Sequence, residues 1–199
     1  MMPRSAVEDH LESLSKMSAT EAASRLLGSD LIRNIDGKLL AGRIVEVEAY
    51  DQNDPASHSF NGKTKRNAVM FGPAGFAYVY FTYGMHFCMN VVVGPEDNAA
   101  AVLIRALQPL RGELIMLKNR GNNQKNLLNG PARLTQAFKI DKTLNGHDLR
   151  CDPLRLVLNP PLSAKEIKWS KRIGIREEAN KDKNWRAVVA NSKYLSRPL

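Results

Sequence analysis

The sequence predicts a single mixed α+β domain, and three observations support this prediction. Residues 30–50 and 76–93 each have the pattern of two β-strands joined by a tight turn. A helix start signal precedes the first of these hairpins. The 199 residues show no internal repeat and no linker, and their number suits one well-packed domain spanning residues 1–199.

A helix is expected on each side of residue 18. Three apolar residues recur at helical spacing, which predicts a short amphipathic helix within residues 1–18, peripheral to the domain. They are Val7, Leu11 and Leu14. Ser18 with Glu21 three positions later forms the pattern of a capping box, so a second helix should run from there to Leu27. Gly28 is its stop signal.

The first hairpin is expected to turn at Asp36-Gly37, a strong two-residue turn signal. Its second arm, GRIVEVEAY, alternates like a half-buried strand. The side chains predicted to face the core are those of Val45, Val47 and Ala49. The alternation of the strand then places the carboxylates of Glu46 and Glu48 together on its opposite face. An acidic pair contrasts with the strongly basic chain, which raises the question of its function.

Residues 51–75 are rich in Asn, Asp, Gly, Ser and Pro and carry several cations. We expect a long, partly basic loop here, and loops of this length are usually functional. The second hairpin follows, with its tip at residues 83–85, and residues 100–107 form a further strand.

Residues 118–130 are polar and predict an exposed, mobile loop. Pro131 then suits the first turn of a short helix through Phe138. In the remaining sequence, residues 172–175 (RIGI) and 185–190 (WRAVVA) are candidate strands.

The chain is strongly basic, with 29 Lys and Arg against 20 Asp and Glu, a formal net charge of +9. This favours a polyanionic partner, because each cation placed on a phosphate releases a counterion; a solvated surface without a partner is the alternative. Secretory signals and membrane spans need a continuous apolar run, which we do not find, so a soluble, intracellular protein is expected.

Cysteine usage points weakly to a reducing compartment. Cys88 and Cys151 are the two cysteines, too few for a disulfide framework and not at a metal-binding spacing. Cys88 has apolar neighbours and is expected to be a buried free thiol.

The second hairpin carries an aromatic cluster. Tyr78, Tyr80 and Tyr83 lie within six residues, and Tyr83 and Met85 flank the glycine at the tip. Hairpin tips are normally polar, so apolar side chains there indicate either a wedge that enters nucleic acid or a tip that folds back onto the core.

Arg105 and Asn90 are polar residues in apolar stretches of the sequence, whereas the sequence around His58 has no unusual feature. Arg105 is flanked by apolar residues and needs an anion, either Glu46 in a structural ion pair or Glu48 at the floor of a cleft. Asn90, in an equally apolar stretch, needs hydrogen-bond partners or a ligand. His58 is, from its local sequence, an ordinary turn residue.

The acidic region contains residues that could bind a metal ion. The candidate ligands are Glu46, Glu48, Asp51, Asp54 and His58. Their spacing matches no known metal-binding motif, so we expect neither a metal nor another cofactor.

Four blocks together resemble the alkyladenine (3-methyladenine) DNA glycosylase family: GRIVEVEAY, ASHSFNGKTKRNAVMFGPAG, AYVYFTYGMHFCMNVV and AVLIRALQPLRG. LNGPARLTQAFKI and RIGI extend the resemblance, which runs from about Ala23 to Arg197. It implies a curved, mostly antiparallel sheet with surrounding helices and a protruding hairpin. It also implies a monomer that hydrolyses the bond between an alkylated purine and deoxyribose in duplex DNA.

The resemblance also implies roles for single residues. Glu48 matches the glutamate that activates a water, and Arg105 matches the arginine that helps to hold it. The backbone carbonyl of Ile173 would be the third contact of that water. The remaining matches concern the flipped base: Tyr50 would stack on one face, His58 and Tyr80 on the other, and Asn90 would disfavour normal guanine.

Contacts with the DNA duplex are expected from the match of Tyr83 and from the basic residues of the loops. Tyr83, together with Met85, would fill the gap that the flipped base leaves. The expected backbone contacts are Lys63, Lys65 and Arg66, with further cations in residues 118–125. Glu46 has no role in the family and is expected at the cleft edge in an ion pair, and the terminal NSKYLSRP resembles the family only loosely.

Two other functions fit parts of the pattern. A basic reader of DNA or RNA would use the tyrosines for stacking without catalysis. A metal-dependent nuclease would use the carboxylates. A strand-cleaving glycosylase is not expected, since no lysine lies among the matched pocket residues to form a Schiff base.

Overall fold

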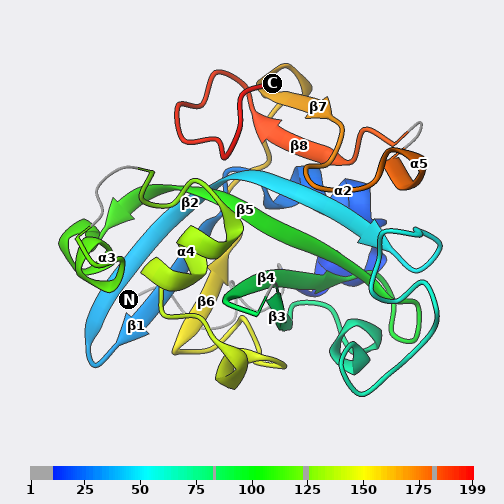
Figure 1. Ribbon diagram of the computed structural model, residues 1–199, viewed down its shortest axis with the longest axis horizontal. Helices are drawn as coiled ribbons and strands as arrows, with labels where there is room; N and C mark the ends of the chain where they lie inside the picture. Colours follow the sequence, from blue (N-terminus) through cyan, green and yellow to red (C-terminus); the bar gives the residue numbers. More distant parts are fainter. Residues whose placement is uncertain (1–10, 83, 123–125, 181–182) are drawn as a thin grey trace.

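The structure is a computed structural model that describes residues 11–82, 84–122, 126–180 and 183–199. Its strands form one eight-stranded sheet in the order β3-β4-β5-β2-β1-β6, with β8 pairing to β2 and β7 to β8. All seven strand pairs are antiparallel. The sheet curves, and helices pack against it (Figure 1), so the predicted α+β fold with a curved antiparallel sheet is confirmed.

The strands are β1 (Asp30–Ile35), β2 (Lys38–Asp51), β3 (Ala77–Thr82), β4 (His86–Val93), β5 (Ala100–Arg111), β6 (Leu154–Val157), β7 (Ile167–Ser170) and β8 (Arg186–Val189). The α-helices are α2 (Ala19–Leu26), α3 (Glu113–Asn119), α4 (Pro131–Ala137) and α5 (Glu177–Asn180). The 3₁₀ turns are η1 (Ser13–Lys16), η2 (Ala68–Phe71), η3 (Lys142–Leu144) and η4 (Ala164–Glu166).

Local signals predicted several elements correctly. The amide of Glu21 donates to Ser18 Oγ and the Ser18 amide donates to the Glu21 carboxylate, so the capping box starts α2. Asp36 and Gly37 have φ of 51° and 78°, the left-handed pair that a tight hairpin turn needs. Cys88 is a buried free thiol, as expected.

Strand β2, which carries both glutamates, does not alternate regularly. Its pairing with β5 shifts register on both sides of Glu46, which marks a β-bulge. Ile44 and Val47 therefore belong to the same main core, whereas Val45 lines a separate cavity. The prediction that Val45 shares the core face with Val47 is wrong, because the bulge reverses the parity of the strand.

The second half of β2 is enclosed on both edges. Its first half pairs with β1, whereas the segment from Glu46 to Glu48 pairs with β5 on one side and β8 on the other. Both glutamates consequently have no exposed surface. Enclosure of Glu46 and Glu48 between β5 and β8 thus creates a buried polar site in the middle of the sheet.

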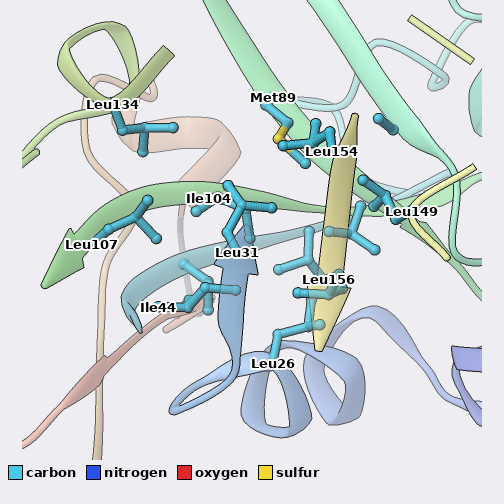
Figure 2. Packing of buried hydrophobic residues seen from close by; sticks show 14 of the residues in the cluster. Leu26, Leu31, Ile44, Met89, Ile104, Leu107, Leu134, Leu149, Leu154 and Leu156 are labelled. Carbon is cyan, nitrogen blue, oxygen red and sulfur yellow. The ribbon is translucent and has the colours of Figure 1, made fainter. Parts of the chain in front are cut away.

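The main core joins the sheet to the helices that pack on it. Figure 2 shows Leu26, Leu31, Ile44, Ile104, Leu107 and Leu134 in contact across α2, β1, β2, β5 and α4. A second, smaller hydrophobic cluster, separate from the main core, includes residues of β3, β4 and β5. It contains Met70, Phe71, Tyr78, Val92, Ala99 and Ala101.

Two predicted features differ from the structure. Residues 172–175 turn around Gly174, at φ 76°, instead of forming a strand. In the predicted exposed loop, Leu127 and Leu128 are buried, because both side chains join the main core. Residues 123–125 of that loop lie outside the described residues.

The described part of the N-terminal segment packs against the domain, since Leu11 and Leu14 are buried in the main core. Residues 11 and 12 are helical and lead directly into η1. The rest of the predicted helix, including Val7, lies outside the described residues. None of the described helices has the length and apolar character that crossing a bilayer requires.

Candidate active site

Four residues line up across strands β2, β5, β4 and β3. Glu48 lies opposite Leu103, Leu103 opposite Asn90, and Asn90 opposite Tyr78. Because directly opposed residues of antiparallel strands point to the same face, this row builds one continuous surface. Leu103 was missed from the sequence, although it lies two positions before Arg105 and hence on the same strand face.

A cavity of about 190 Å³ adjoins this row. Its lining includes Tyr50, His58, Tyr78, Tyr80 and Asn90. The structure therefore brings together all four residues that were predicted to contact a base, together with Tyr78. Pockets for drug-sized ligands measure about 300–1,000 Å³, so this smaller cavity suits a single planar group.

The aromatic walls of the cavity are electrically neutral. The His58 ring lies edge-on to Tyr80, with centroids 4.5 Å apart, and His58 Nδ1 lies 2.9 Å from the Tyr78 hydroxyl. Burial lowers the pKa of His58, and the positive charge of Arg66 lowers it further. Burial raises the pKa of Tyr78 to about 12.

We expect Arg66→Gln to raise the pKa of His58 toward its ordinary value of about 6.5, because a nearby cation is removed. The shift is partial, since burial is the larger cause. An NMR titration of the His58 ring measures it, with Lys65→Gln on the same loop as control. An unchanged His58 titration in Arg66→Gln contradicts the assigned electrostatic contact.

The loop that carries His58 is fixed by two buried anchors. Asn67 Nδ2 donates to the backbone carbonyls of His58 and Gly62, at 2.7 and 3.0 Å. Asp54 forms a fully buried ion pair with Arg172, whose guanidinium also lies 4.7 Å from the Tyr50 ring centroid. Arg172 was assigned from the sequence only to a strand, because its partner is 118 residues away.

The three cations predicted to contact the DNA backbone are exposed on this loop. The Arg66 guanidinium lies 5.8 Å from the Tyr80 ring centroid, at the edge of the cavity. Lys63 Nζ lies 4.0 Å from Asp97 Oδ1, and both side chains are exposed. Their contact with phosphate, and that of Lys65, stays a prediction.

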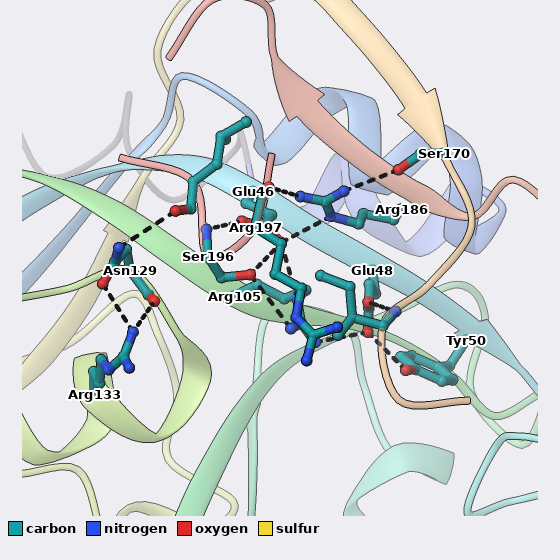
Figure 3. Close-up of polar contacts among 12 residues, drawn as sticks. Glu46, Glu48, Tyr50, Arg105, Asn129, Arg133, Ser170, Arg186, Ser196 and Arg197 are labelled. Carbon is teal, nitrogen blue, oxygen red and sulfur yellow. Dashed lines mark hydrogen bonds and ion pairs between the residues drawn. The ribbon is translucent and has the colours of Figure 1, made fainter. Parts of the chain in front are cut away.

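Glu48 is fully buried but lies among polar groups (Figure 3). Its Oε1 accepts from the Ile173 amide at 2.7 Å, and its Oε2 accepts from the Tyr50 hydroxyl at 2.8 Å and from Arg105 Nη1 at 3.2 Å. Burial and the charge of Glu48 raise the pKa of Tyr50 well above its ordinary value, so this hydroxyl stays a donor. The role predicted for the Ile173 carbonyl stays untested.

Arg105 combines the two arrangements that the sequence left open. Its Nε donates to Glu46 Oε1 at 3.0 Å while its Nη1 reaches Glu48. Glu46 also accepts from Arg186 Nε at 2.9 Å, which confirms an ion pair with arginine. The predicted place at the cleft edge is wrong, because β5, β8 and Ser196 cover Glu46 completely.

The carboxyl of Glu46 is held in its ionised form. Burial raises its pKa, but hydrogen bonds from Ser196 and Arg186 outweigh burial and bring the pKa below its ordinary value. The two carboxylates of β2 thus face two guanidiniums, those of Arg105 and Arg186, in one closed cluster.

The tip of the second hairpin protrudes in part. Met85 is 68% exposed, so its side chain does not fold back onto the core. Phe81, on the adjoining end of β3, is 49% exposed. Tyr83 lies outside the described residues, and the insertion of Tyr83 and Met85 into DNA stays a prediction.

Comparison with known proteins agrees with this site. Residues 13–193 match the family described as methylpurine-DNA glycosylase. The chain belongs to this family. A protein of Carboxydothermus hydrogenoformans is 51% identical over 177 residues, covering 88% of this chain and 92% of the relative. A protein of Nitrosospira multiformis is 46% identical over 183 residues, covering 92% of this chain and 91% of the relative. Both carry the name "Putative 3-methyladenine DNA glycosylase".

The family resemblance seen in the sequence is therefore confirmed, and with it the enzyme class, a DNA glycosylase acting in DNA repair. The residues assigned to the glycosylase site come from β2, β3, β4, β5 and the loop after β2.

Two of the candidate metal ligands predicted from the sequence, Glu46 and Glu48, share Arg105 as an ion-pair partner. Within the described residues, no group of three or more His, Cys, Asp or Glu side chains is arranged to hold a metal ion. Glu46 and Asp54 each form ion pairs with arginine instead.

Proposed function

We propose that this glycosylase removes alkylated purines from duplex DNA by hydrolysis of the N-glycosidic bond and leaves an abasic site. The proposed substrates are 3-methyladenine and 7-methylguanine, with neutral lesions such as hypoxanthine and ethenoadenine as an extension. The observation that carries the proposal is a buried Glu48–Arg105 pair joined through Tyr50 to an aromatic cavity sized for one base. We further propose a monomer without a cofactor, acting inside the cell wherever the DNA lies.

The cavity supports the binding of a flipped, cationic base. Extracting a base from the stack costs a few kcal/mol, and stacking on an aromatic ring returns about 1–3 kcal/mol per base. We place the base between Tyr50 on one face and His58 with Tyr80 on the other. Methylation of a ring nitrogen gives the purine a positive charge, which adds a cation–π attraction to these neutral rings.

Asn90 is placed to discriminate among purines. It lines the cavity, and its Nδ2 donates to the Tyr78 carbonyl at 3.1 Å, which fixes the orientation of the amide. We propose that this fixed amide opposes the 2-amino group of normal guanine.

The contacts of Glu48 support its role as general base. A carboxylate has about four lone-pair sites, and the contacts described above use three of them. The remaining site can accept a hydrogen bond from a water molecule. The water oxygen attacks C1′, its proton passes to Glu48, and the electrons of the N-glycosidic bond leave with the purine, which becomes neutral if it was cationic.

One further group, the Arg105 guanidinium, assists this step. Arg105 holds the water beside Glu48, and the carboxylate of Glu48 stabilises the positive charge that develops on the sugar. A neutral lesion has no charge to lose, so its departure requires protonation of the base. The proposed reaction forms no Schiff base and leaves the strand uncut.

On the duplex, we propose that Tyr83 and Met85 fill the gap left by the base, while Lys63, Lys65 and Arg66 neutralise phosphates. A wedge at a protruding hairpin stabilises the kinked DNA in which a base is displaced. Phosphate contacts make binding weaken steeply as salt concentration rises.

The test is chromatography of free bases after the protein is incubated with randomly methylated duplex DNA. We expect release of 3-methyladenine and 7-methylguanine, the same release with a chelator present, and intact strands until alkali is added. Binding without release identifies a reader of nucleic acid and contradicts the proposal. Strand cleavage that a chelator abolishes identifies a metal-dependent nuclease and contradicts it equally.

A further inference from the structure

The last residues of the chain close over the buried pair of Glu46 and Arg105. The Ser196 amide donates to Glu46 Oε2 at 2.6 Å, and the Ser196 hydroxyl donates to Glu46 Oε1 at 2.7 Å (Figure 3). These contacts bridge 150 positions of sequence. Ser196 lies beyond residues 13–193, which match the family, so the match assigns it no role.

Ser196 completes the coordination of a carboxylate that has no exposed surface. Glu46 Oε1 accepts from Arg105 Nε, Arg186 Nε and Ser196 Oγ, and Oε2 accepts from the Ser196 amide. Ser196 therefore supplies two of these four hydrogen bonds. Without them, a buried carboxylate is held by the two arginines alone and is free to rotate toward either.

The same hydroxyl also reaches Arg105 directly. Arg105 Nη2 lies 3.4 Å from Ser196 Oγ, while Nε is bound to Glu46 and Nη1 to Glu48. All three guanidinium nitrogens thus have different partners. Because the guanidinium is planar and rigid, three separate contacts fix both its plane and the direction in which Nη1 points.

The tail is itself anchored on two sides of Ser196. The Leu195 carbonyl accepts from Asn129 Nδ2 at 3.4 Å, and the Arg197 carbonyl accepts from Arg186 Nη2 at 2.5 Å. The anchoring residues come from the segment before α4 and from β8. The tail is therefore docked onto the cluster through its backbone, independently of the Ser196 side chain.

We propose that Ser196 is a positioning residue of the glycosylase: through Glu46 it fixes the Arg105 guanidinium so that Nη1 faces Glu48. This inference rests on the proposed function, in which Glu48 and Arg105 share the attacking water. Ser196 touches neither base nor sugar in this arrangement and acts only through its two neighbours.

The test compares Ser196→Ala with Ser196→Thr in single-turnover release of 7-methylguanine from methylated duplex DNA at saturating protein. We expect Ser196→Ala to be slower by about tenfold or more, since small misplacements of catalytic groups cost up to about a hundredfold. Affinity for a duplex with an abasic-site analogue should change less than twofold. Ser196→Thr, which keeps the hydroxyl, should retain most of the rate, and Ser192→Ala in the same tail is the matched control.

A pH profile provides a readout that a merely structural role would not move. Groups that face Glu46 are Arg105, Arg186, Ser196 and, on its own strand, Glu48. The hydrogen bond from the Ser196 hydroxyl helps to hold the pKa of Glu46 low, so its loss in Ser196→Ala raises that pKa, while the backbone amide of residue 196 still donates to Glu46. In Ser196→Ala the rate should therefore fall at a higher pH on the acid side than in the wild type.

The outcomes separate this inference from the proposed function. An active wild type with an equally active Ser196→Ala overturns the positioning role and leaves the proposed function standing. If Ser196→Thr loses as much activity as Ser196→Ala, or if rate and DNA affinity fall together, the positioning role is also overturned. A wild type that releases no purine overturns the proposed function instead.

Discussion

Glu48→Gln is expected to lower the rate of purine release by about 10²–10⁴-fold, the usual contribution of a general base. The substitution keeps the size of the side chain but removes both its negative charge and its capacity to take a proton. Single-turnover release of 7-methylguanine from methylated duplex DNA measures the effect. The glutamine side chain cannot make all the hydrogen bonds that Glu48 makes. Whichever way its amide is turned, the NH₂ group, itself a donor, faces the donor of Ile173 or those of Tyr50 and Arg105.

DNA binding provides the necessary control for this variant. The aromatic cavity and the exposed cations are unchanged, so affinity for a duplex with an abasic-site analogue should stay within a few-fold of the wild type. Glu113→Gln, at the exposed start of α3, is the matched variant and should keep full activity. Normal release by Glu48→Gln would show that another group activates the water.

Glu46→Ala is expected to destabilise the fold by about 3–5 kcal/mol, the usual cost of leaving a buried charge without its partner. Arg105 and Arg186 are both nearly buried, and each loses an ion pair at once. The free energy of unfolding in urea measures this effect. Asp30→Ala is the control, because it removes an ion pair to exposed Arg43 on the same sheet and should cost less than about 1 kcal/mol.

The difference between wild type and Glu46→Ala should depend on pH in a defined direction. The pKa of Glu46 is lower in the folded protein than its ordinary value of 4.5. Its stabilising contribution is therefore fully present above about pH 4.5 and is lost as the pH falls through the folded value. A difference that stays constant on acidification would contradict the ionised, paired state of Glu46.

Local sequence patterns were sufficient where the structure depends on neighbours in the chain. The Ser18 capping box, the turn at Asp36-Gly37 and the start of α4 at Pro131 each depend on contacts within a few residues. Part of the cavity lining was also predicted: Tyr80 and Asn90 stand out in the apolar stretches of β3 and β4, whereas Tyr50 and His58 were assigned from the family resemblance.

The features that the sequence did not reveal depend on distant contacts. The bulge at Val45 changes which residues of β2 face the core, and no local pattern marks it. The partners of Asp54 and Glu46 lie 118 and 150 residues away, in segments whose own sequences suggested a strand or no role. Strands β6 and β7 have four residues each, too few for an alternation to be recognised.

The same long-range contacts build the polar part of the site. Strand parity places Glu46 and Glu48 on one face, but their partners come from β5, from the turn after β7 and, for Glu46, from the C-terminal tail. The sequence thus identified the acid and the arginine, whereas the way in which they are held became apparent only from the fold.

The most direct test of the central claim is a crystal structure of the Glu48→Gln variant bound to duplex DNA that contains a single ethenoadenine. The account predicts the lesion in the cavity between Tyr50 and the pair His58–Tyr80. A water bound to position 48 and Arg105 should lie about 3–3.5 Å from C1′ of the everted nucleotide. A lesion bound elsewhere, or a C1′ that faces away from position 48, would contradict the account.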